Sequence, residues 1–189
     1  MRTRYLVFLA VVLVVAGIGV AMLRRGVGPL LNPAGCTARV GGVVVDLSPE
    51  QARNAALISA LGIRRGLPAR AVSIAFATAY QESKLRNLDH GDRDSVGIFQ
   101  QRPSQGWGRR SQILDPYYST NAFYDALAKV HGFETMQITQ AAQLVQRSGY
   151  PQAYEPHAAD SRALASALTG YSPGGRFTCV VPPLAGAKG

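Results

Sequence analysis

Residues 71–79 constrain the fold more than any other stretch of the chain. Seven of these nine residues are apolar, and they surround a helical wheel almost completely: Ala71, Val72, Ile74, Ala75, Phe76, Ala77 and Ala79. A helix that is apolar on all faces must be covered on all sides by other parts of the chain. The sequence therefore predicts a buried central helix that begins at Pro68 and carries Glu82 near its end.

Glu82 is the first candidate functional residue, because a carboxyl group at the edge of an apolar helix is only partly hydrated. Desolvation disfavours the charged form, so we expect a raised pKa and proton donation near neutral pH. An ordinary solvated carboxylate is the alternative, since most glutamates near helix ends lie at the surface.

Two short motifs carry a resemblance to a known family. Glu82-Ser83-x-Leu85, followed by Gly97-Ile98-Phe99-Gln100, resembles the first two motifs of lytic transglycosylase catalytic domains in the lysozyme-like superfamily. The run 81–107 is also similar to actinobacterial exported lysozyme-like proteins, and the match covers roughly residues 48–170. The resemblance implies that Glu82 is the general acid and base and that Ser83 supports it or the substrate. It also implies that Gly97, Gln100 and the neighbouring Gln101 line a sugar cleft.

The third motif of that family, Ala-Tyr-Asn, has a tyrosine that touches the catalytic glutamate. The corresponding helix here runs from Ala142 to Tyr150 and contains no Ala-Tyr-Asn. Gln146 or Tyr150 could supply the polar contact. The departure leaves open whether the chain is a transglycosylase or a hydrolase.

The segment 87–95 is dense in turn-forming residues and contains three aspartates, Asp89, Asp92 and Asp94. Three hypotheses stay open for them. They could hold a turn through side-chain hydrogen bonds, Asp92 or Asp94 could be a second catalytic carboxylate, or the loop could bind a cation. The cation hypothesis is the weakest, because the spacing differs from that of an EF-hand and no glutamate closes a twelve-residue loop.

Trp107 is the single tryptophan and lies between Gly106 and Gly108. A lone tryptophan usually belongs to the core. In a glycine-flanked loop close to a sugar-cleft motif, it could instead stack on a saccharide ring.

The N-terminal residues 1–25 read as a membrane anchor or an export signal. Tyr5 to Leu23 is a run of 19 apolar or small residues, about the length of a transmembrane helix. A cleavable signal usually has a shorter apolar core and a clear small-residue cleavage site, so we expect an uncleaved anchor. The rest of the chain would then be extracytoplasmic, with secretion as the alternative.

The charge balance limits the possible partners. The chain has 20 basic and 11 acidic residues, hence a net charge of +9, and four arginines flank the apolar run, which leaves +5 for the remainder. This modest excess favours anionic partners such as cell-wall polymers or membrane surfaces. A nucleic-acid partner is not expected, because no concentrated basic face with interleaved aromatic residues is evident.

The two cysteines, Cys36 and Cys179, lie near the two ends of the predicted domain. An even, small number in an exported protein predicts one disulfide between them. With no Cys-x-x-Cys motif and no clustered histidines, we expect no metal site and no cofactor.

Helical patterns account for most of the remaining chain, and short connections with almost no alternating strand pattern predict an all-α domain. Ser48 and Gln51 form a capping box for a first helix, and Asp115 caps a third. Such a domain is compatible with the helical lobe of a lysozyme-like fold. The expected organisation is an N-terminal transmembrane helix or signal in 1–25, a linker in 26–47, the domain in 48–170 and a tail in 171–189.

These observations favour a monomeric, peptidoglycan-cleaving muramidase that acts on glycan strands with Glu82 as its single catalytic carboxylate. A lytic transglycosylase uses the substrate's own N-acetyl group and 6-hydroxyl, as the resemblance implies, whereas a hydrolase needs a second carboxylate. Two other classes remain as alternatives. One is a non-catalytic cell-wall-binding or scaffold protein, and the other is a cation-binding accessory protein built on the aspartate loop.

Overall fold

Helix α4, Ala69–Ser83, is the buried central helix that the sequence predicts. Every residue from 71 to 79 is buried, and most of these side chains are completely inaccessible. The helix ends because Lys84 adopts a left-handed conformation with φ 55° and Leu85 follows with φ 59°. This sharp turn brings Leu85 back into the core and leaves Glu82 in the last helical turn.

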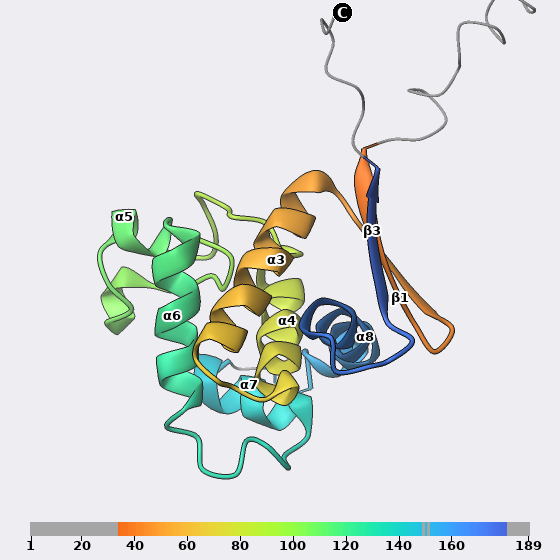
Figure 1. Cartoon of the computed structure of the whole chain (residues 1–189). Helices are drawn as coiled ribbons and strands as arrows, with labels where there is room; N and C mark the ends of the chain where they lie inside the picture. Colours follow the sequence, from red (N-terminus) through yellow and green to blue (C-terminus); the bar gives the residue numbers. More distant parts are fainter. Residues whose placement is uncertain (1–33, 149, 151, 181–189) are drawn as a thin grey trace, which may run out of the picture. The chain divides into compact units, whose positions relative to one another are not determined.

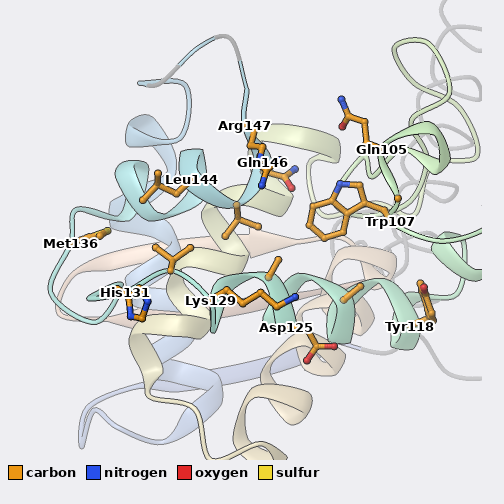
Figure 2. A pocket seen from close by; sticks show the side chains of 15 residues that line it. Gln105, Trp107, Tyr118, Asp125, Lys129, His131, Met136, Leu144, Gln146 and Arg147 are labelled. Carbon is orange, nitrogen blue, oxygen red and sulfur yellow. The ribbon is translucent and has the colours of Figure 1, made fainter.

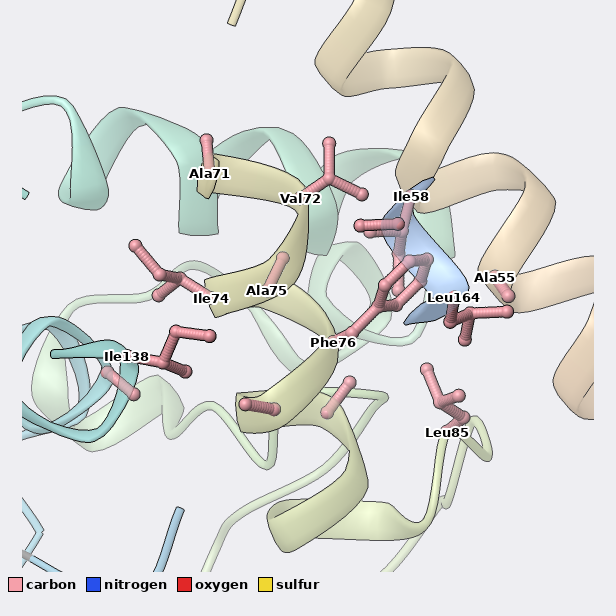
Figure 3. Packing of buried hydrophobic residues seen from close by; sticks show 14 of the residues in the cluster. Ala55, Ile58, Ala71, Val72, Ile74, Ala75, Phe76, Leu85, Ile138 and Leu164 are labelled. Carbon is pink, nitrogen blue, oxygen red and sulfur yellow. The ribbon is translucent and has the colours of Figure 1, made fainter. Parts of the chain in front are cut away.

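Helices from both sides cover α4, which explains its uniform apolar surface. Its neighbours are α3 (Pro49–Arg64), α6 (Pro116–Leu127), α7 (Ile138–Gln146) and α8 (Ala158–Thr169). Figure 3 shows Ile74 pointing toward Ile138 of α7, while Phe76 points the opposite way, toward Leu164 of α8. A helix that is apolar on all faces is therefore covered by other helices on several sides.

The computed structural model describes residues 34–148, 150 and 152–180. The predicted membrane anchor or signal, residues 1–25, lies outside this part of the chain. Within the described ranges, the search for helices of sufficient length and apolarity to cross a bilayer identifies none.

A three-stranded antiparallel sheet shows that the all-α prediction is wrong. The strands are β1 (Gly35–Val40), β2 (Val43–Leu47) and β3 (Arg176–Val180), in the order β2-β1-β3. β1 and β2 form a hairpin whose register runs from Cys36 opposite Leu47 to Val40 opposite Val43. The fold is therefore mixed, with six α-helices and this sheet in the described part of the chain.

The hairpin depends on Gly41 and Gly42, which form its two-residue turn with φ values of 54° and 87°. Two consecutive residues with positive φ are typical of the tight turns that match the twist of paired strands, and glycine adopts them without strain. The glycine pair falls within the predicted linker 26–47, although valines flank it on both sides.

The sheet also extends the folded region beyond the predicted domain 48–170. Residues 35–47 of the expected linker form β1 and β2, and residues 176–180 of the expected tail form β3. The compact unit spans Gly35–Cys179. Figure 1 shows α8 between the sheet and α4, and α8 packs on both.

The disulfide between Cys36 and Cys179 joins β1 to β3 and confirms the predicted pairing. The two residues are 143 positions apart, so the bond ties the first strand of the folded unit to its last. A structural disulfide fits an extracellular or secreted protein, because thiols stay reduced in the cytosol.

The predicted helix caps are present. Ser48 and Gln51 exchange hydrogen bonds as a capping box at the start of α3, and the Asp115 carboxylate accepts a hydrogen bond from the Tyr117 backbone N–H at the start of α6. The shorter elements are α5 (Arg110–Ile113) and the 3-10 turns η1 (Pro103–Gln105) and η2 (Glu155–His157).

Candidate active site

Glu82 lies half-buried in the last turn of α4. The preceding turns of the helix are fully buried, and the left-handed residues Lys84 and Leu85 end the helix directly behind it. The carbonyl end of a helix carries partial negative charge, which further disfavours a carboxylate at this position. The fold thus keeps a carboxyl group between the core and the surface.

The Tyr154 hydroxyl donates a hydrogen bond of 2.9 Å to Oε1 of Glu82. Tyr154 is completely buried, and its pKa is raised by burial first and then by the nearby Glu82, so the phenol stays protonated. The Ser148 side chain acts in the opposite direction, because its hydrogen bond lowers the pKa of Tyr154.

The segment that carries Tyr154 is docked onto α4 by His157. The His157 ring stacks on Tyr80, with 5.8 Å between ring centroids, and its Nε2 lies 3.2 Å from Oε1 of Gln81. Both partners immediately precede Glu82 in the chain. These contacts fix the irregular segment between α7 and α8 against the end of α4.

Gln146, the last residue of α7, is the second partner of Glu82. Its Nε2 donates a hydrogen bond of 2.8 Å to the carbonyl oxygen of Phe99, and the same side chain hydrogen-bonds the Glu82 carboxylate. An amide nitrogen has two protons, so one Gln146 side chain can serve both acceptors. Gln146 therefore connects Glu82 to the segment 97–100.

The pKa of Glu82 is raised above its usual value by burial, which is the largest effect on it. Hydrogen bonds from Gln146 and Tyr154 act in the opposite direction, because they stabilise the charged form. Burial outweighs them. The predicted raised pKa of this carboxyl group is therefore present, together with two donors that hold the group in a fixed orientation.

Ser83 is buried and turned away from the surface. Its Oγ donates to the carbonyl oxygen of Ile98 at 2.7 Å, lies 3.1 Å from the Ala79 carbonyl oxygen and accepts from the Arg86 backbone N–H. Ser83 thus joins the end of α4 to the second motif. Ser83 therefore holds the segment beside Glu82 in place. The resemblance also allows direct contact between Ser83 and substrate, which stays a prediction.

Position 97 needs a glycine because the backbone of Ile113 packs closely against it. Gly97 has a φ of 82°, and a Cβ atom at this position would lie 2.8 Å from the carbonyl oxygen of Ile113. The close approach is therefore between two backbone segments of the protein. A side chain here would displace the loop that carries Ile98 and Phe99.

The side chains of Gln100 and Gln101 are both engaged within the protein. Gln100 accepts a hydrogen bond from Ser95 Oγ and donates to the Gly97 carbonyl oxygen at 3.1 Å. Gln101 is buried, and its Nε2 donates to the Ser119 carbonyl oxygen at 3.1 Å. Both residues stabilise the wall of the site from behind, and neither points a free amide into a cleft.

A groove of about 890 Å³ is lined by residues of α6 and α7 and of the segments that follow them. Glu82 is not among its lining residues, but its partner Gln146 is. Figure 2 shows the Trp107 indole lying between α6 and the end of α7 that carries Gln146 and Arg147. Trp107 packs against the core with part of its surface and lines the groove with the rest. The core interpretation of this tryptophan thus holds in part, and its stacking on a sugar ring stays a prediction. Gln146 is shared by the groove and Glu82.

The structure brings together Glu82, Gln146 and Tyr154, of which the last was not predicted from the sequence. Tyr150, which was predicted, is 78% exposed, and the contacts of Glu82 are made by other residues. Ala153-Tyr154 reproduces the first two residues of the Ala-Tyr-Asn motif, and its tyrosine lies eight positions after Gln146. This dipeptide was the available signal, and it was missed because it follows the helix instead of lying within it.

Asp94 holds its loop to residues 102–104. Its carboxylate accepts hydrogen bonds from the Ser104 backbone N–H, the Ser104 hydroxyl and the Arg102 Nε, at 2.8, 3.0 and 2.7 Å. The Ser104 N–H, followed by Arg102, holds the pKa of Asp94 well below its usual range. Of the three hypotheses for the loop, a turn held by hydrogen bonds describes Asp94 best.

The other two aspartates of this loop are exposed. Asp92 lies 3.9 Å from the Arg93 guanidinium, and Asp89 contacts the neighbouring His90 at 2.8 Å. In the part of the chain that the structure describes, no group of three or more His, Cys, Asp or Glu residues is arranged to hold a metal ion. Neither Asp92 nor Asp94 is among the residues that line the groove.

No family model and no curated protein sequence matches this chain.

Proposed function

We propose that this chain is a peptidoglycan lytic transglycosylase that cleaves the MurNAc-GlcNAc β-1,4 bond with Glu82 as its single catalytic carboxylate. The observation that carries this proposal is the hydrogen bond of 2.9 Å from the buried Tyr154 hydroxyl to Glu82. Gln146, the other partner of Glu82, lines the neighbouring groove. A tyrosine against the glutamate is the feature that the resemblance to lytic transglycosylases requires, and the Glu-Ser and Gly-x-x-Gln motifs adjoin it.

In the first step, protonated Glu82 donates its proton to the glycosidic oxygen while the bond to the anomeric carbon breaks. The raised pKa supports this role, because a larger fraction of the carboxyl groups keeps a proton near neutral pH. The cationic centre that develops on the sugar is stabilised by the substrate's own N-acetyl group, so no second protein carboxylate is needed.

In the second step, the Glu82 carboxylate accepts the proton of the muramyl 6-hydroxyl as that oxygen bonds to the anomeric carbon. The product is an anhydro-sugar, and Glu82 returns to its protonated form. One carboxyl group thus gives and regains one proton in each cycle, and no water molecule is consumed.

Tyr154 and Gln146 are positioning residues in this scheme. Both donate to the carboxylate, and their own orientations are fixed by Ser148 and by the Phe99 carbonyl group respectively. Holding a proton donor in a productive geometry contributes to catalysis because misplacement of the reacting groups is costly.

The state of the other carboxylates supports a transglycosylase over a hydrolase. A hydrolase needs a second carboxylate near the reacting sugar, either as a nucleophile or to activate water. Asp94 is fully engaged with Arg102 and Ser104, and Asp92 is exposed beside Arg93. Asp125 lines the groove but forms an ion pair of 2.6 Å with Arg65.

The decisive experiment is a digest of purified peptidoglycan followed by mass spectrometry of the soluble products, with wild-type chain and Glu82→Gln. Anhydromuropeptides that disappear in the variant are expected. Products with reducing ends that disappear in the variant would indicate a hydrolase. If neither protein releases products and both still sediment with the cell wall, the chain is a non-catalytic wall-binding protein.

A further inference from the structure

The groove beside Glu82 is lined by an excess of unpaired positive charge. Lys129, two residues after the end of α6, and Arg147, the residue after α7, both line it, and both side chains are exposed. Neither forms an ion pair or a side-chain hydrogen bond with any residue that the structure describes. The ring of His131 adds another nitrogen to the same wall.

The groove's acidic residue does not neutralise these cations. Asp125 lies in the last turn of α6, four positions before Lys129, which follows the end of the helix. Its Oδ1 is instead 2.6 Å from Nη2 of Arg65, which is not among the lining residues of the groove. Lys129 and Arg147 are therefore left to interact with a ligand.

We propose that this groove recognises a β-1,4-linked amino-sugar chain through carboxylates that the chain carries, with Lys129 and Arg147 as the specificity-determining residues. The proposal rests on the proposed function, because it assigns the substrate class of the same site. A guanidinium binds a carboxylate with two parallel hydrogen bonds, whereas an ammonium acts as a point charge. Trp107 supplies the flat apolar surface on which an uncharged sugar ring stacks.

The order of these residues along the groove fits such a chain. Arg147 directly follows Gln146, which hydrogen-bonds Glu82, so a carboxylate on the sugar at the cleaved bond would meet Arg147. Lys129 lies just after the end of α6, across from Arg147 in Figure 2, where a substituent of a neighbouring sugar would meet it. Carboxylates on muramic acid come from two sources, the lactyl ether of a bare strand and the peptide of a substituted strand.

Binding can be measured without catalysis by using the Glu82→Gln form of the whole chain. Calorimetry gives the dissociation constant, and the fluorescence of Trp107, the single tryptophan, reports binding in the groove. Three probes of equal length separate the chemistries: a neutral chitin oligosaccharide, a glycan strand stripped of peptides, and a peptide-bearing strand.

We expect both carboxylate-bearing strands to bind at least about tenfold more tightly than the neutral oligosaccharide, a difference typical of one charge-assisted contact. The stripped and peptide-bearing strands show which source of carboxylate contributes more. The difference should shrink as salt is raised, since exposed charges are screened. The double variant Lys129→Gln/Arg147→Gln should abolish the difference and leave binding of the neutral oligosaccharide unchanged.

The matched control is Arg53→Gln/Arg162→Gln, which removes the same net charge from exposed positions on α3 and α8. It should preserve the preference, and circular dichroism melts of both double variants check that they are folded. Equal binding of all three probes, no binding of any probe, or equal loss in the control would overturn the proposal. If the wild-type chain forms product but the strands show no binding preference, only this proposal is overturned. If the carboxylate-bearing strands are preferred but the wild-type chain forms no product, only the proposed catalysis is overturned.

Discussion

The Tyr154 hydroxyl reaches Oε1 of Glu82 at 2.9 Å, although the two residues are 72 positions apart in the chain. Tyr154 lies in an irregular segment, and its place is fixed by the packing of His157 on Tyr80 and by its own complete burial. A side chain held this firmly against a half-buried carboxyl group is suited to orienting that group for proton transfer. The predictions below separate this role from general contributions to stability.

Tyr154→Phe is expected to lower the catalytic rate and to move the basic limb of its pH profile to higher pH. The lost hydrogen bond lowers the pKa of Glu82 in the wild type, so its removal raises that pKa further. A loss of about 10- to 100-fold in rate is reasonable, since a positioned acid contributes about 10²–10⁴-fold in total. Rates of muropeptide release measured across pH test this expectation.

Tyr150→Phe is the matched control, because Tyr150 is 78% exposed. It should change neither the rate nor the pH profile. If Tyr154→Phe lowered thermal stability but left the pH profile of the remaining activity in place, Tyr154 would be only a core residue.

Glu82→Gln should stabilise the protein against thermal unfolding at neutral pH. The folded-state pKa of Glu82 is raised, so its favourable contribution is complete below the unfolded pKa and is lost as pH rises through the folded value. The melting temperature of the variant should therefore exceed that of the wild type increasingly from about pH 4 upward. Glu134→Gln, at an exposed position, is the control and should show no such trend.

Asp94→Asn should destabilise the fold at neutral pH without abolishing cleavage. The pKa of Asp94 is depressed in the folded state, so its stabilising contribution is present above the unfolded pKa and lost as pH falls through the folded value. The difference in melting temperature between wild type and variant should therefore shrink below about pH 4. Asp92→Asn, which changes an exposed side chain, should alter neither stability nor products. A folded Asp92 or Asp94 variant that makes no product would instead support the two-carboxylate hydrolase.

Replacing both cysteines by alanine should lower the free energy of unfolding by about 3–5 kcal/mol, since the disulfide closes a long loop. The bond joins residues 143 positions apart and ties β1 to β3. Urea denaturation of the double variant and of the oxidised wild type measures the difference. A difference below about 1 kcal/mol would show that the sheet holds the two ends together without the covalent bond.

The sequence supports the central elements of this fold because their signals are local. The apolar residues 71–79 predict a buried helix, Ser48 and Asp115 mark helix starts, and Glu82 follows the helix closely enough to be identified as desolvated. The disulfide also follows from the number and position of the cysteines. Each of these inferences needs only neighbouring residues in the chain or the number of cysteines.

The sheet and the contacts of the site depend on residues that are far apart in the chain. Local sequence signals therefore could not predict them. β3 pairs with β1 from the other end of the chain, and its five residues show no strong pattern alone. The inward direction of Ser83 and the engagement of Gln100 are fixed by the loop that packs against them. Tyr154 was missed because it follows α7, and only tertiary packing brings it to Glu82.

Digestion of peptidoglycan in water labelled with heavy oxygen tests the central claim most directly. In the proposed mechanism, Glu82 accepts the proton of the muramyl 6-hydroxyl, and that oxygen bonds to the anomeric carbon. The new sugar ends should then carry no label and have the mass of an anhydro-sugar. These products should be lost in Glu82→Gln and reduced in Tyr154→Phe. New ends that carry one heavy oxygen atom would show that water is the acceptor, and the account of Glu82 as a transglycosylase acid and base would be wrong.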